Sequence, residues 1–104
     1  SGRFREASTR LDRVVQIAPD DDEAQFYLGV SHLLAGESSA AERAFRTAIT
    51  LAPSSTLYRW YLAQTELAQG DGKAAEAELR TILAANEEFS AEARLLLERI
   101  AAPR

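Results

Sequence analysis

The chain has 104 residues, the length of one domain, and its 46% hydrophobic and 27% charged residues argue against extensive disorder. Its net charge of −4 comes from interleaved acidic and basic residues, so it lacks the basic stripe that nucleic-acid binding needs. The absence of cysteine excludes disulfides and thiolate metal sites, and is compatible with the cytoplasm or the periplasm.

The N-terminal segment predicts a helix over 3–17. Leu11, Val14 and Val15 recur at three- and four-residue steps and give this segment one apolar stripe. Pro19 follows the segment and cannot continue the helix, because proline lacks an N–H and clashes with the preceding turn.

The second predicted helix covers 22–35. Asp20, Asp21 and Asp22 offer carboxylates that cap its first turn and meet its positive end. Gly36 follows it, at a point where the chain must turn sharply and where glycine adopts left-handed backbone angles at little cost.

The remaining predicted helices cover 38–52, 55–69, 72–85 and 90–101. The first and third of these each have one apolar stripe in which small residues lie among large ones, so that a neighbouring helix can approach closely. Apolar residues cover more than half of the circumference of 55–69, which therefore needs two neighbours, or one neighbour and a ligand. The last helix has one apolar side and resembles a cap.

A period of 34 residues runs through these elements. Pro19 recurs as Pro53 and Gly36 as Gly70, each 34 positions later. Such a period indicates a stack of short units that contact only their neighbours. It favours an extended binding surface over an enclosed catalytic pocket.

The spacing resembles the tetratricopeptide repeat, a helix-turn-helix unit with the signature aromatic-x2-Leu-Gly-x2-Tyr, Ala-x3-Phe and Pro. The unit from 22 onward matches it at Leu28, Gly29, Ala41, Phe45, Ala48 and Pro53. Gln25 and His32 replace the two aromatic residues of the signature. The next unit diverges further, with Arg59 and Glu66 at those two positions.

This resemblance implies an all-α fold, a tetratricopeptide-type stack of antiparallel helix pairs in a right-handed superhelix. It divides a single domain, 1–104, into the second helix of a partial repeat (1–21), two repeats (22–55 and 56–89) and a capping helix (90–104). Because the chain contains no methionine, we expect it to be an excised or processed piece of a longer protein.

No cofactor, metal or catalytic site is predicted. His32 is the only histidine, and the pattern supplies no nucleophile or acid beside it, so we expect it to pack in a slot usually held by tyrosine. The acidic run 20–23 lacks the alternating ligands of a calcium loop and is interpreted as helix capping. The run 70–73 lacks the spacing of a phosphate-binding loop and is interpreted as a turn.

The predicted partner-binding residues form pairs 34 positions apart on the first helices of the two units. They are Phe26 and Trp60, Tyr27 and Tyr61, and Val30 and Gln64. The resemblance implies that they lie at or near the floor of a groove; the alternative is that they fill gaps between adjacent helices. Some members of the family hold a C-terminal carboxylate with basic side chains, but this face has only Arg94, so that mode is not expected.

The sequence therefore predicts a non-catalytic module that binds a peptide or helix of a protein partner in a concave groove, with no nucleic acid and no membrane insertion. Two alternatives remain, a structural or self-associating segment and an accessory repeat region of a larger enzyme. Helix 3–17 lacks the partner helix of its unit, and its uncovered stripe predicts a homodimer through the N-terminal helix.

Overall fold

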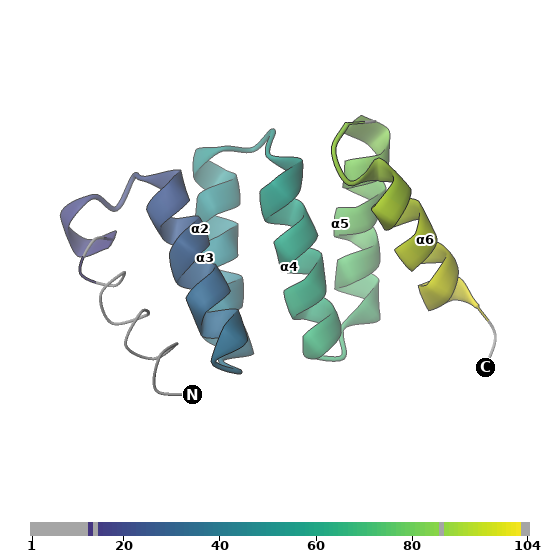
Figure 1. Ribbon diagram of the computed structural model, residues 1–104, viewed down its shortest axis with the longest axis horizontal. Helices are drawn as coiled ribbons and strands as arrows, with labels where there is room; N and C mark the ends of the chain where they lie inside the picture. The colour runs from purple at the N-terminus through teal and green to yellow at the C-terminus, as the bar shows by residue number, and fades with distance from the viewer. Residues whose placement is uncertain (1–12, 14, 86, 103–104) are drawn as a thin grey trace. The chain divides into compact units, whose positions relative to one another are not determined.

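The computed structural model describes residues 13, 15–85 and 87–102, and this part of the chain contains helices and no strand. The helices are α2 (Asp22–Leu34), α3 (Ser38–Leu51), α4 (Thr56–Ala68), α5 (Gly72–Ala85) and α6 (Ser90–Ala101) (Figure 1). The ends of all five lie within one residue of the predicted ends, which confirms these helix predictions.

The predicted helix 3–17 and its apolar stripe lie for the most part outside the described residues, although residues 15–17 are helical. The homodimer predicted through that stripe therefore stays a prediction. Within the described ranges, no helix is both long enough and apolar enough to cross a membrane.

The contacts divide the chain into two compact units, Ser1–Ser55 and Thr56–Arg104. In the first, α2 packs antiparallel to α3 (Figure 1). Gly29 permits their close approach, because a Cβ atom at this position would lie 2.6 Å from Cε1 of Phe45. The Phe26 ring packs beside the same phenylalanine, with ring centroids 5.9 Å apart. The small residue in the family signature thus provides the space for the Phe45 ring.

The turn between α2 and α3 depends on a left-handed glycine. Gly36 has φ of 80°, and its N–H donates to the carbonyl oxygen of Leu33 at 3.1 Å. The N–H of Glu37 donates to the carbonyl oxygen of His32 at 2.8 Å. The same two bonds recur around Gly70, which has φ of 79°. Both turns are Schellman motifs, which satisfy the last carbonyl groups of α2 and α4.

An aspartate side chain caps one helix in each of the two units. Oδ1 of Asp21 accepts a hydrogen bond from the backbone N–H of Ala24 at 3.2 Å, at the start of α2. Oδ1 of Asp71 accepts one from the N–H of Ala74 at 3.1 Å, at the start of α5. Of the three aspartates predicted to cap α2, Asp21 is the N-cap residue.

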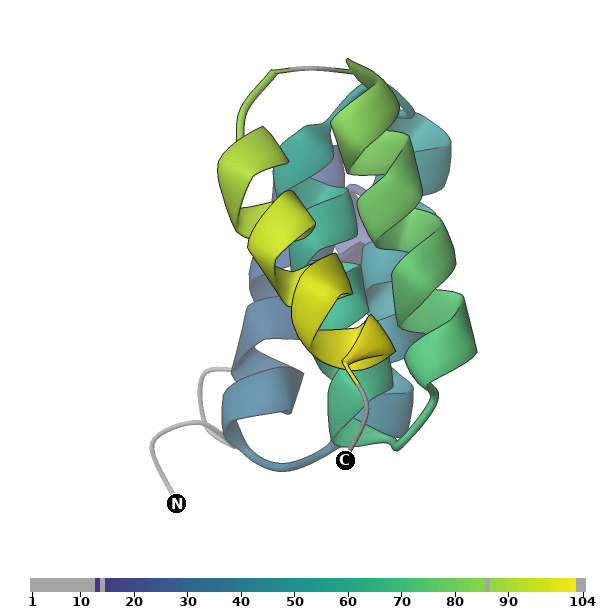
Figure 2. The ribbon, with the colours of Figure 1, turned by 90° about the vertical axis from the view of Figure 1, so that its right-hand side faces the viewer.

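In the second unit, α5 packs against both α4 and α6, and the three helices lie side by side (Figures 1 and 2). Their shared core consists of Ala63, Ala75, Leu79, Ile82 and Ala93, all fully buried. Arg59, at an aromatic position of the family signature, reaches from α4 to Glu78 of α5 with Nη1 and Oε1 3.1 Å apart. Both side chains are largely buried, so an ion pair takes the place of aromatic packing at this position.

Candidate functional site

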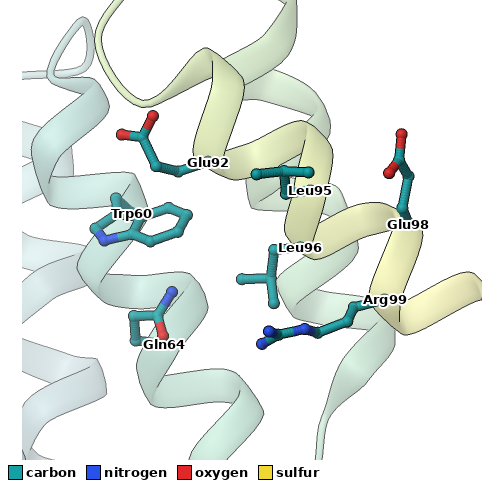
Figure 3. Close-up of a pocket in the computed structure, with 7 residues that line it drawn as sticks. All are labelled: Trp60, Gln64, Glu92, Leu95, Leu96, Glu98 and Arg99. Atoms are coloured by element: carbon teal, nitrogen blue, oxygen red, sulfur yellow. The ribbon is translucent and has the colours of Figure 1, made fainter.

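A pocket of about 620 Å³ lies between α4 and α6 in the second unit (Figure 3). Its lining consists of Trp60, Gln64, Glu92, Leu95, Leu96, Glu98 and Arg99. The tryptophan and the glutamine face it from α4, and the other five side chains come from α6. The volume falls within the range of about 300–1,000 Å³ typical of ligand sites.

Trp60 belongs both to the core and to the pocket wall. Its ring stacks on Phe89, with centroids 5.5 Å apart and planes inclined by 11°. It also packs against the buried cluster of the unit while lining the pocket. The two interpretations that the sequence left open for this residue, core filler and groove wall, therefore both describe its surroundings.

Phe89 is held in an unusual backbone conformation at the start of α6. Its φ of 67° lies in the left-handed region, and it is the only described residue other than glycine with a positive φ. That conformation costs a residue with a side chain about 1–2 kcal/mol. Stacking between aromatic rings contributes about 0.5–1.5 kcal/mol, so the contact with Trp60 offsets much of this cost and fixes where α6 begins.

The apolar floor of the pocket is a pair of leucines on α6. Leu96 is partly buried and packs against the core of the unit, whereas Leu95 is 66% exposed. Glu92 and Arg99 lie three residues before and after this pair, so all four side chains fall on one side of the helix. The pocket therefore combines an apolar centre with charges of both signs at its rim.

Gln64 contributes a polar group to the α4 wall. Its Nε2 atom is buried and has no hydrogen-bond partner among the described residues. An unsatisfied buried donor costs about 1–3 kcal/mol.

The structure brings two of the six predicted partner-binding residues, Trp60 and Gln64, into this pocket. Tyr61 lies one position away on α4 and is partly buried. The other three lie on α2 in the first unit. Among these, Phe26 is 8% exposed and Tyr27 is 55% exposed, with their rings 5.4 Å apart, and Val30 is partly buried. The role of all six in binding stays a prediction.

The leucines and charges of α6 were not among the predicted site residues. Leu95 lies 34 positions after Tyr61, and Glu98 lies 34 positions after Gln64. The 34-residue period reaches both positions, but the predicted pairs ended at the second repeat and did not extend to the last helix. Arg94, which the sequence did single out, is exposed and does not line the pocket.

A smaller pocket of about 200 Å³ lies between α2 and α3 and includes His32. Nδ1 of His32 lies 3.0 Å from Oε1 of Glu37, the residue before α3. The histidine is partly buried, and its contact ties the end of α2 to the start of α3. In the described part of the chain, no group of three or more histidine, aspartate or glutamate side chains is placed to hold a metal ion.

Two models of one protein family, the tetratricopeptide repeat, match the chain, over residues 1–56 and 32–100. No curated protein sequence matches it. Among solved structures, the Yersinia enterocolitica type III secretion chaperone SycD in complex with a peptide of the translocator YopD aligns with a TM-score of 0.87 at 19% identity. The alignment covers 96% of this chain and 81% of SycD. Another SycD structure, described as an alternative dimer, aligns with a TM-score of 0.84 at 20% identity, over 96% of this chain and 80% of SycD. These similarities confirm the predicted all-α repeat fold.

Proposed function

The chain belongs to the tetratricopeptide repeat family, and from this premise we propose that it is a protein-binding module that holds a peptide or helix of a protein partner. The pocket between α4 and α6 carries the proposal, because its apolar floor is accessible at Leu95. The fold is typical of non-catalytic binding modules. SycD, which shares it, is described in complex with a peptide, and this supports the proposal by analogy.

The residues of the pocket suggest how a segment would be held. An apolar side chain of the partner would pack between Trp60 and the two leucines, where burial of apolar area supplies most of the affinity. Gln64, which lines the pocket, would give the partner a polar contact on the α4 wall. Glu92 and Arg99 at the rim would select for flanking charges.

The predicted residues outside the pocket have different roles in this proposal. Tyr27 and Val30 would extend the binding face along α2, where the tyrosine is exposed. Phe26 would support Tyr27 from the core, because its ring is buried against Phe45. Tyr61 would support Trp60 on α4. With the predicted repeat bounds 22–55 and 56–89, α2 and α4 would be the first helices of their repeats.

Peptides selected from a random library against the whole chain provide the probe for a test. Trp60 is the only tryptophan, so a peptide bound in the pocket should change the emission of the chain. Leu95→Asp should weaken binding of the selected peptides by at least about tenfold, because it places a charge on the apolar floor. Leu51→Asp on α3 is the matched control, since Leu51 is an exposed leucine outside the pocket. Peptides that bind both variants as they bind the parent chain would argue against this site.

A further inference from the structure

Four of the five residues with which α6 lines the pocket form a pattern that is complementary to its own reverse; Glu98, the fifth, lies outside it. Leu95 and Leu96 stand at its centre, with Glu92 three residues before them and Arg99 three residues after. Turning the helix end for end exchanges leucine with leucine and places each charge where the opposite charge was. Such a face is complementary to a second copy of itself in the antiparallel direction, which is the requirement for an interface with two-fold symmetry.

The two charges of this pattern have no partner within their own helix. On α3, Arg46 Nε lies 2.8 Å from Oε2 of Glu42, four residues earlier, and α5 has an equivalent pair at 2.7 Å. Glu92 and Arg99 are seven residues apart, and the positions four residues inward from each are leucines. No ion pair joins either residue to another side chain in the described ranges. Both charges are exposed and available to an external partner.

Of the two leucines at the centre of the same face, Leu96 packs in part against the core and Leu95 is uncovered. Leu95 is 66% exposed, the largest exposed fraction of any large apolar residue of the second unit. It lies between the two charges, on the side of the pocket opposite Trp60 (Figure 3). A face with an apolar centre and charged ends has the anatomy of a protein–protein interface.

We propose that a second copy of this chain covers this face, through antiparallel pairing of α6 with α6 of the second copy. In such a pair, Glu92 meets the partner's Arg99 at one end, the reciprocal contact forms at the other, and the leucines interleave between them. A stable interface buries about 800 Å² on each partner, and one helix face buries less than this. The dimer is therefore weak and depends on concentration. A second copy would occupy the same face as the proposed peptide, so the two would compete for it, and the dimer is therefore measured on the chain without peptide.

Charge reversal tests the pairing directly. Sedimentation equilibrium of the 104-residue chain, from about 10 μM to about 1 mM, measures the dimer dissociation constant; a weak interface falls in this range. Glu92→Arg and Arg99→Glu should each weaken the dimer by about tenfold or more, because each places like charges opposite each other. The double variant restores both opposite-charge contacts and should dimerise to within about threefold of the parent chain. Arg94→Glu, on the same helix but outside the pocket, is the control and should have little effect.

A unique cysteine gives a second measurement. The chain has no cysteine, so Leu95→Cys introduces a single thiol next to the symmetry axis of the proposed pair. Mild oxidation should cross-link this variant faster than Leu51→Cys, whose thiol lies on α3. Circular dichroism of every variant checks that it folds.

Three results would overturn the proposal. The first is a chain that stays monomeric to about 1 mM, which would leave the pocket to a peptide partner. The second is a dimer that is insensitive to both single reversals, as expected for association through the N-terminal helix. The third is a double variant as weak as the single ones, which would mean that Glu92 and the partner's Arg99 do not meet.

Discussion

Trp60 has one ring face against Phe89 and contributes to the wall of a solvent-accessible pocket, so the same side chain stabilises the second unit and shapes its surface. The sequence could not decide between these roles, because a helix that is apolar over most of its circumference does not reveal which part its neighbours cover. The leucines of α6 were missed for a related reason. A leucine at helical spacing is ordinary core, and only the exposure of Leu95 distinguishes it from Leu96.

Gly29 gives a prediction at the scale of one residue. We expect Gly29→Ala to lower the free energy of unfolding by about 1–3 kcal/mol, because the added methyl group would lie within 2.6 Å of the Phe45 ring and force the two helices apart. Urea unfolding followed by circular dichroism measures the change.

Gly72→Ala is the control for this substitution. Gly72 begins α5, has a negative φ, and a Cβ atom there would meet nothing within 4 Å. Alanine at that position should be neutral or stabilise the chain by up to about 1 kcal/mol. If Gly29→Ala proved as stable as Gly72→Ala, the packing of α2 on α3 would be looser than described.

At the scale of the elements, the residues that cap or end helices made the helix ends predictable. Proline, aspartate and glycine act on their immediate neighbours, so their effects depend little on the rest of the fold. The predicted range 72–85 matches α5 at both ends, and 90–101 matches α6. The pocket between α4 and α6 could not be predicted in the same way. It depends on the left-handed backbone of Phe89, and the sequence indicates no glycine or asparagine at that position.

The aspartate caps give a prediction for the helices. Asp21→Ala and Asp71→Ala should each lower the free energy of unfolding by about 1 kcal/mol, because each leaves an N–H of a first helical turn without its acceptor. Asp20→Ala changes an exposed neighbour that is not the N-cap residue, and it should stay within about 0.5 kcal/mol of the parent chain. Thermal and urea unfolding of the three variants would show a different order if capping were unimportant here.

At the scale of the whole molecule, the contacts fall into two units, and the resemblance to a repeat family predicts that stability is a sum of local terms. A period of 34 residues was enough to predict the family and the class of fold, because repetition constrains every unit at once. The surface that each unit presents is not constrained by the period. The two aromatic positions of the signature, for example, are filled by polar residues with contacts of their own, including the ion pair between Arg59 and Glu78.

Hydrogen exchange can test whether the two units respond separately. Leu79→Ala removes a fully buried side chain from the core of the second unit and should cost about 2–5 kcal/mol. Amide protons of α4, α5 and α6 should then exchange faster, while those of α2 and α3 change less. Leu28→Ala, in the first unit, should produce the opposite distribution. A uniform increase across all five helices for both variants would indicate a single cooperative unit.

The glycine turns at 36 and 70 also bear on how quickly the chain folds. Each joins two helices through three residues, and its hydrogen bonds connect groups at most five positions apart. Proteins rich in such local contacts fold within about microseconds to milliseconds, since little chain entropy is lost before the contacts form. The α2–α3 hairpin forms its contacts between residues 22 and 51. It can therefore close on a ribosome while α6 is still being synthesised.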